Sequence, residues 1–98
     1  MKLQEAIQAC DEGDFVTHKA FDSKQSMHMY KGTLYYEDGA NLSNQMDWIE
    51  RQECFKDGWA IKCKSENVDK NLLSEMHIKN KKYMLRCDTY ERCIKVII

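Results

Sequence analysis

The first 22 residues carry an apolar pattern whose period changes at a glycine, and this change constrains the fold more than any other stretch. The apolar residues before the glycine are Leu3, Ala6, Ile7 and Cys10. Residues three or four positions apart lie on the same side of a helix, so this spacing predicts an amphipathic helix. Gly13 is the expected end of the helix, because glycine adopts a positive φ without a Cβ clash.

A strand over residues 15–21 is predicted next, because β-branched and aromatic residues are concentrated there. Successive side chains of a strand point to opposite faces. One face of this strand would carry Phe15, Thr17, Lys19 and Phe21, and the other Val16, His18 and Ala20. We therefore expect Phe21 and Lys19 to point the same way at the end of the strand, and His18 to point the opposite way.

A tight antiparallel meander is predicted over residues 26–42. Its parts are a strand at 26–31, a turn at Gly32-Thr33, a strand at 34–37, a turn at Asp38-Gly39 and a short strand at 40–42. The turns are assigned from glycine, which supplies the positive φ that short hairpin loops need. His28 stands between two methionines, and we interpret it as a surface histidine with satisfied hydrogen bonds.

Helical and extended patterns continue to the last residue. A helix at 43–55 capped by Ser43 is followed by a strand at 59–64, with Trp59, Ile61 and Cys63 on one face. A further helix is predicted to start at 65–67, and its apolar stripe is Val68, Leu72, Leu73 and Met76. Residues 82–87 and 92–98 are expected to form a final hairpin, whose apolar last strand would lie inside a sheet.

These elements predict an α+β fold, in which a small antiparallel sheet of meander and C-terminal hairpin packs with two to three helices. The chain has 98 residues, no proline and no internal repeat. We therefore expect one domain over residues 1–98.

The charge balance limits the partners of this chain. Lys and Arg number 15 against 16 Asp and Glu, so the basic footprint of proteins that bind nucleic acid polymers is missing. The charged N-terminus does not resemble a signal peptide, and no apolar run approaches the roughly 20 residues that cross a bilayer. We expect a cytoplasmic protein with no membrane partner.

Five cysteines occur, at positions 10, 54, 63, 87 and 93. Their odd number and the lack of Cys-x-x-Cys spacing favour reduced thiols over a disulfide framework. Two histidines and two cysteines could make a zinc site on paper, but structural zinc sites use close ligand pairs, which do not occur here. We therefore expect reduced thiols, no metal and no cofactor.

The order of motifs over residues 1–64 resembles a phage-encoded family of small domains, formerly of unknown function, that is typified by a Thoeris anti-defence protein. The matching motifs are Glu5-Ala6-Ile7, Gly13, Val16 and Trp59-Ala60-Ile61. His18 stands where that family commonly has arginine, and Phe21 where it has tryptophan. These two departures change the groups that would contact a ligand, and residues 65–98 are not covered.

The resemblance implies a non-enzymatic protein that binds and sequesters a nucleotide-derived immune signal. Members of the family form homo-oligomers and hold cyclic ADP-ribose isomers or cyclic oligonucleotides in pockets between protomers. A pocket of this kind needs aromatic rings that stack on a base and cations that meet phosphate. The residues that would supply these groups here are Phe21, Lys19, His18, Lys24, Tyr30 and Tyr36.

Other interpretations of the same residues are open. Phe21 and Trp59 could be core residues, and tyrosines on a half-exposed meander commonly form cross-strand pairs. The competing function is a protein-binding inhibitor or accessory protein that uses an exposed Tyr/Met face and no small ligand. We expect no enzymatic activity, since the sequence has no Gly-rich phosphate loop and no distinctive pair of acids.

We predict that the protein is a homo-oligomer, either a dimer or a tetramer. A chain of 98 residues leaves much apolar surface exposed, and self-association in closed symmetry buries it. Light scattering at micromolar concentration is expected to give a multiple of the 11.6 kDa chain mass. A particle with the mass of one chain would contradict the prediction.

Overall fold

The computed structural model describes residues 1–22, 25–78, 83–89 and 92–97. The helices are α1 (Leu3–Asp11), α2 (Met46–Arg51) and α3 (Lys70–Ile78), with the 3-10 helices η1 (Ser43–Gln45), η2 (Glu53–Phe55) and η3 (Ser65–Asn67). The strands are β1 (Phe15–His18), β2 (Met27–Tyr30), β3 (Thr33–Tyr36), β4 (Trp59–Cys63), β5 (Tyr83–Thr89) and β6 (Arg92–Ile97). No helix in this part of the chain is both long and apolar enough to span a membrane.

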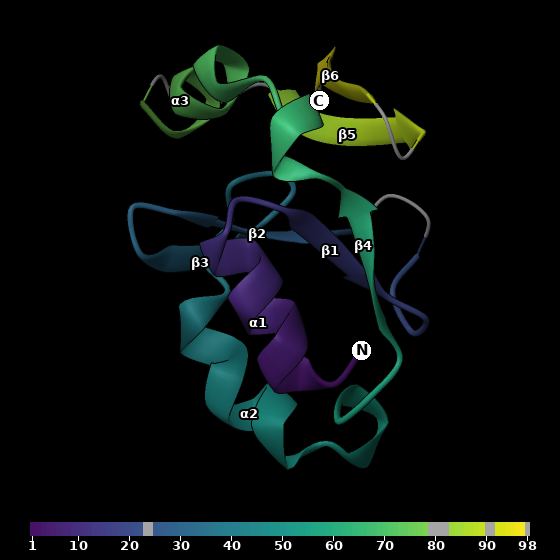
Figure 1. The fold of residues 1–98 in the computed structure, drawn as a ribbon. Helices are drawn as coiled ribbons and strands as arrows, with labels where there is room; N and C mark the ends of the chain where they lie inside the picture. Colours follow the sequence, from purple (N-terminus) through teal and green to yellow (C-terminus); the bar gives the residue numbers. More distant parts are fainter. Residues whose placement is uncertain (23–24, 79–82, 90–91, 98) are drawn as a thin grey trace.

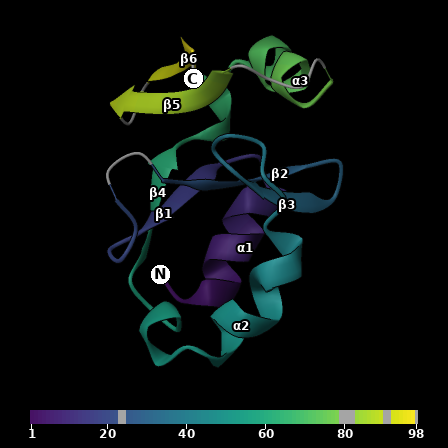
Figure 2. The ribbon, with the colours of Figure 1, turned by 180° about the vertical axis from the view of Figure 1, so that it is seen from behind.

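Four strands form one antiparallel sheet in the order β3-β2-β1-β4. Helices α1 and α2 lie on one side of this sheet, and α3 lies with the β5–β6 hairpin on the other (Figure 1 and, from behind, Figure 2). The predicted α+β class is confirmed. The expectation that the last strand lies inside a sheet is wrong, because within the described residues β6 pairs with β5 alone.

Each face of the sheet buries its own apolar cluster. The cluster on the α1 side consists of Ala6, Ala9, Cys10, Val16, Met27, Leu34, Leu42, Ile49, Phe55 and Trp59. The cluster on the α3 side consists of Phe15, Cys63, Val68 and Met76, with Leu72 and Leu73 packed against it. The predicted apolar faces of α1 and α3 are thus confirmed, since both turn toward the sheet.

The end of α1 is a Schellman motif, as the position of Gly13 suggested. Gly13 has φ +100°, its N–H donates to the carbonyl of Cys10 at 2.9 Å, and the Asp14 N–H donates to Ala9 at 3.0 Å. These two bonds satisfy carbonyls at the helix end and reverse the chain into β1. The predicted helix and its glycine stop are both confirmed.

A bulge in β4 corrects the predicted faces of that strand. Val16 pairs with Ile61 and Phe15 with Cys63, so the register skips Lys62. The skipped residue shifts the alternation by one position beyond Ile61. Trp59 and Ile61 therefore face the α1-side cluster, whereas Cys63 joins the α3-side cluster.

The meander differs from the prediction in its first turn and in its last strand. The first hairpin turn is Lys31-Gly32 instead of Gly32-Thr33, and both turn residues have positive φ, at 49° and 81°. This pair of left-handed residues matches the right-handed twist of the flanking strands. The short strand expected at 40–42 is reduced to one bridge between Tyr35 and Asn41.

The predicted helix at 43–55 is interrupted, and both later helices start differently from the prediction. Gln52 is extended, which separates α2 from η2. Ser43 does not cap α2; instead its own N–H donates to the Asn41 carboxamide at 2.8 Å. α3 starts at Lys70, after Asp69, whose carboxylate accepts N–H groups of the first helical turn at 3.0 and 3.1 Å.

Candidate functional site

The predicted ligand-binding residues fall into three separate places. His18, Lys19 and Phe21 lie together at the end of β1. Tyr30 stacks on His77 of α3, with ring centroids 4.2 Å apart, whereas Tyr36 packs against the α1-side cluster and bonds Gln45. Lys24 lies outside the described residues. Within one chain, the two tyrosines are on opposite faces of the sheet.

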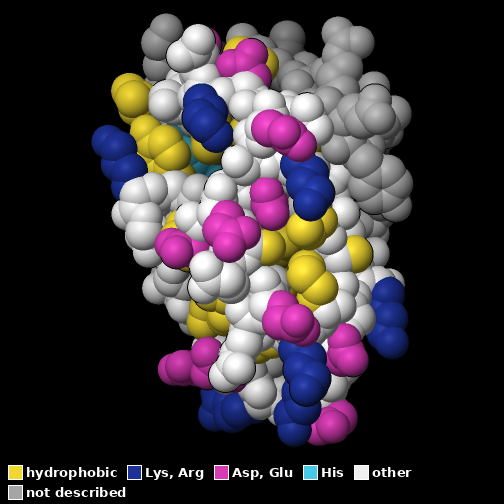
Figure 3. Space-filling view, in the orientation of Figure 1, with side chains coloured by type: hydrophobic (Ala, Val, Ile, Leu, Met, Phe, Trp, Pro, Cys, Tyr) yellow, Lys and Arg dark blue, Asp and Glu magenta, His cyan; other side chains and the backbone are white. Residues whose placement is uncertain are grey.

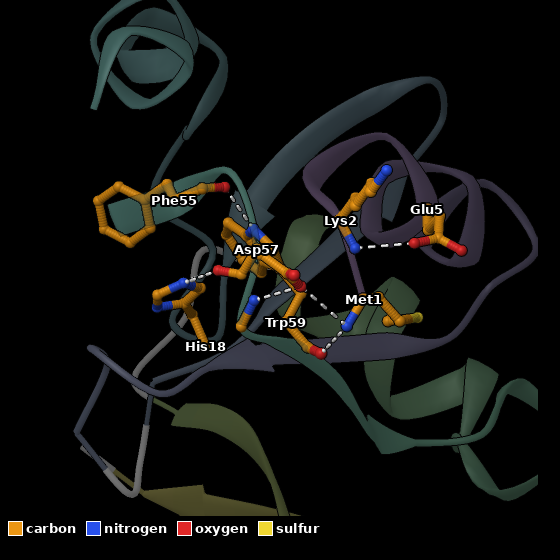
Figure 4. A network of polar contacts seen from close by, with 8 residues as sticks. Met1, Lys2, Glu5, His18, Phe55, Asp57 and Trp59 are labelled. Atoms are coloured by element: carbon orange, nitrogen blue, oxygen red, sulfur yellow. Dashed lines mark hydrogen bonds and ion pairs between the residues drawn. The ribbon is translucent and has the colours of Figure 1, made fainter. Parts of the chain in front are cut away.

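His18 is a buried hub, with an exposed fraction of 2 %. Its ring centroid lies 4.7 Å from that of Phe55 and 4.8 Å from that of Trp59. The backbone N–H of Ala20 donates to Nδ1 at 2.9 Å. Nε2 lies 2.7 Å from the carbonyl oxygen of Asp57, as Figure 4 shows. Because Nδ1 accepts, Nε2 carries the proton and donates to Asp57.

This hub corrects the predicted geometry of β1. The strand ends at His18 instead of Phe21, and the Phe21 N–H turns back to the His18 carbonyl at 2.9 Å. The turn ends the alternation of faces, so the rings of Phe21 and His18 lie on the same side, with centroids 6.0 Å apart. Both nitrogens of His18 are used by the main chain, so a phosphate would have to displace one of these bonds.

Phe21 is half-buried at the edge of the α1-side cluster. Its ring meets that of Trp59 edge-on, with centroids 5.5 Å apart and planes at 87°, and lies 6.0 Å from that of Phe55. Trp59 itself is structural, as predicted: it is 3 % exposed and its indole N–H donates to the Phe55 carbonyl at 2.8 Å. Phe21 therefore has a fixed position and a partly exposed ring.

Charged groups lie around Gly58, next to His18. Lys19 is exposed, and its aliphatic chain lies over Gly58. The pKa of Asp57 is lowered, chiefly because the Gly58 N–H donates to its carboxylate, with smaller contributions from the N-terminal ammonium group and Lys19. The same N-terminal group donates to the Trp59 carbonyl at 2.7 Å and lies 3.6 Å from Asp57.

Trp48 is a surface aromatic that the sequence did not assign to a site. It lies on α2 with 54 % of its side chain exposed, and its ring meets that of Phe55 at a centroid distance of 6.0 Å. We use the name aromatic corner for Lys19, Phe21, Trp48 and Phe55 around His18. Trp48 lies outside the apolar face of its helix, which Met46 and Ile49 form. This position in the sequence pattern indicates that its side chain is exposed.

A hollow of about 470 Å³ lies between α1 and β4. Its ionisable side chains are those of Glu5, Glu12, Asp14 and Lys64. An excess of carboxylates repels phosphate, so this hollow does not suit a nucleotide. On the face of the molecule seen in Figure 3, acidic and basic side chains are interspersed.

His28 and His77 meet on the α3 side of the sheet. Their Nε2 atoms are 2.8 Å apart, and His28 is 1 % exposed, so its interpretation as a surface histidine is wrong. The ring of His28 stacks on that of Phe15 at a centroid distance of 4.6 Å. Burial, with a smaller contribution from His77, lowers the pKa of His28 to about 3.

Cys10, Cys54 and Cys63 form no disulfide bond, and the side chains of Cys87 and Cys93 are not described. Burial and the charge of Asp14 raise the pKa of Cys10 to about 12, which keeps it in the unreactive thiol form. In residues 1–22 and 25–78, no three His, Cys, Asp or Glu side chains gather in a way that could hold a metal ion.

Comparisons of the chain with models of protein families, with curated proteins and with solved structures gave no match. The resemblance to the anti-defence family stays a prediction. Function must therefore be inferred from the residues of this chain.

Replacing Gly58 with alanine is expected to destabilise the fold more than replacing Gly39. Both glycines have positive φ, at +91° and +85°, which costs an alanine about 1–2 kcal/mol. A Cβ at Gly58 would also lie 3.0 Å from Nε2 of His18, which is held by Asp57, whereas nothing lies within 4 Å at Gly39. Urea unfolding should show Gly58→Ala to be the less stable variant, and equal losses would contradict the role of His18.

Alkylation of the native protein should separate the cysteines by burial. Cys54 is exposed, whereas Cys10 and Cys63 are buried, so iodoacetamide is expected to modify Cys54 and spare the other two. Peptide mass mapping reads each site, and the urea-unfolded protein is the control in which all three react. Rapid modification of Cys10 in the native state would contradict its buried position.

Proposed function

We propose that the protein binds a small nucleotide-derived ligand without transforming it, and that it sequesters this ligand as the anti-defence family does. The observation that carries the proposal is the pair formed by Phe21 and Lys19 at the aromatic corner. Phe21, a half-buried aromatic ring with a fixed position, follows the exposed Lys19 by two residues at the end of β1. These are the two groups that a base and a phosphate require.

The support beneath Phe21 favours stacking. Its ring rests against Trp59 and Phe55, so little rotamer freedom remains to be lost when a ligand binds. A preformed ring can contribute about 1–3 kcal/mol by stacking on a base. Lys19 supplies a flexible point charge that can reach a phosphate near the ring.

The structural use of the histidines and buried thiols supports binding over catalysis. Both nitrogens of His18 bond the main chain, and His28 is enclosed between Phe15 and His77. A general base must reach a substrate proton, and a nucleophilic cysteine needs a lowered pKa, whereas that of Cys10 is raised to about 12.

A protein partner is the second candidate, and the exposure of Trp48 favours it. The Tyr/Met face expected for such a partner is half-buried: Tyr30 and Tyr35 contact His77, and Met29 and Tyr36 pack on the α1-side cluster. Trp48 is 54 % exposed, and tryptophan is enriched among the residues that dominate protein interfaces. The two candidates therefore use different parts of the aromatic corner.

Substitutions of Phe21 are expected to change ligand affinity more than stability. Phe21→Leu keeps apolar packing and removes the flat ring, so binding should weaken by about 1–3 kcal/mol. Phe21→Trp restores the residue of the resembling family and should bind at least as tightly as the natural chain. Calorimetry with cyclic dinucleotides and cyclic ADP-ribose isomers measures affinity, and a thermal melt of each variant checks the fold.

Trp48→Leu is the matched control, because it alters an exposed aromatic of the same corner. Nucleotide binding should survive this change, whereas binding to a protein partner should not. Ligand released by heating the purified protein should absorb at the nucleotide maximum. Equal affinities of the natural chain and Phe21→Leu for every ligand that binds would overturn the assignment of the site.

A further inference from the structure

One partly buried contact joins α3 to the sheet through two titratable rings. His28 on β2 and His77 on α3 are separated by 49 positions in the sequence, and their Nε2 atoms lie 2.8 Å apart. Aromatic stacking fixes both rings: His28 lies on Phe15 at 4.6 Å, and His77 on Tyr30 at 4.2 Å between centroids. The proposed ligand corner lies elsewhere, at the end of β1, and does not use this pair.

The short distance fixes where the protons are. Two ring nitrogens in hydrogen-bond contact need one N–H and one bare nitrogen. Nδ1 of His28 is buried without a partner, and a buried N–H without an acceptor is rarer in proteins than an unsatisfied acceptor. We therefore assign the His28 proton to Nε2, which donates to a bare Nε2 of His77.

We propose that the His28–His77 contact is a pH-sensitive latch that keeps α3 docked on the sheet at neutral pH and releases it in mild acid. A proton added to Nε2 of His77 would place two N–H donors against each other. A proton added to His28 would bury a charged ring with an unpaired N–H, which is costly. Either proton is taken up more easily when the rings separate.

The surroundings of the pair fit this role. The described rings that contact the two histidines are Phe15 from β1, Tyr30 from β2 and Tyr35 from β3. The ring centroid of Tyr35 is 4.4 Å from that of His77 on α3 and 6.0 Å from that of His28. The Lys31 ammonium group lies 5.5 Å from the centroid of Tyr30.

The direction of the pH dependence follows from the pKa of His28, which burial and His77 lower from 6.5 to about 3. A histidine whose pKa is depressed in the docked state stabilises docking fully above its free value. That contribution is lost as pH falls through the window from about 6.5 toward 3. At a pH of about 5, one histidine of this kind shifts the docking equilibrium by about 30-fold.

Apolar contacts between α3 and the sheet oppose the release of α3. The effect of protonation is therefore confined to the α3 side. Val68 and Met76 are buried in the α3-side cluster, with Leu72 and Leu73 packed against it. Protonation therefore shifts the balance between docked and released α3 without unfolding the α1 side of the sheet.

Hydrogen exchange with NMR detection tests the latch in the intact protein at pH about 7.5 and about 5.0, with protection factors corrected for intrinsic rates. Amides of α3 are expected to lose about 30-fold in protection at the lower pH, whereas amides of α1 should keep theirs. Unchanged protection of α3, or an equal loss in α1, would overturn the proposal.

A variant and a spectroscopic measurement complete the test. His28→Phe keeps an aromatic ring against Phe15 and removes the buried titrating group, so the pH dependence of α3 should disappear. Full dependence in this variant would contradict the latch. The nitrogen chemical shifts of the histidine rings in the natural protein give a readout that needs no variant. In the docked state at pH about 5, His28 should remain neutral with its proton on Nε2. A charged His28 in that state would overturn the proposal.

Discussion

The two hydrogen bonds of the His18 ring determine how one end of the sheet is built. One nitrogen accepts the N–H of Ala20 and ends β1, and the other donates to Asp57, just before β4 begins. The ring thereby joins segments that lie 39 positions apart in the sequence, and it supports Phe21, Phe55 and Trp59 around it. Both nitrogens of this buried imidazole are hydrogen-bonded, and an unpaired polar atom in this position would cost stability.

The sheet separates two kinds of interior. The α1 side is a continuous apolar cluster between helix and strands, closed at its rim by the aromatic corner. The α3 side is smaller and contains two stacked pairs, Phe15 with His28 and Tyr30 with His77, which meet through the two histidines. Its packing therefore depends on aromatic and polar contacts together. The proposed binding surface therefore rests on the more apolar layer, whereas the proposed pH response belongs to the layer that contains the His28–His77 pair.

Local periodicity predicted most of the helices and strands, but not where the strand that carries the candidate site residues ends. The α1 helix, its glycine end, the stripe of α3 and the strand order of the meander depend on neighbours in sequence, and they could be predicted. The end of β1 could not be predicted in this way, because it depends on the hydrogen bond between His18 and the carbonyl oxygen of Asp57, which lies in a distant turn. Of the six candidate site residues, Lys19, Phe21 and His18 are brought together, whereas Tyr30 and Tyr36 point to opposite faces because their strands place them there.

The bulge at Lys62 has a consequence for comparing this chain with others. Trp59, Ala60 and Ile61 alternate regularly before it, and Cys63 after it is out of phase with them by one residue. Lys62 thus behaves as an insertion that changes strand length and leaves both buried faces as they were. A homologous strand without it would be one residue shorter and would present the same side chains, so the two sequences would align only with a gap at this position.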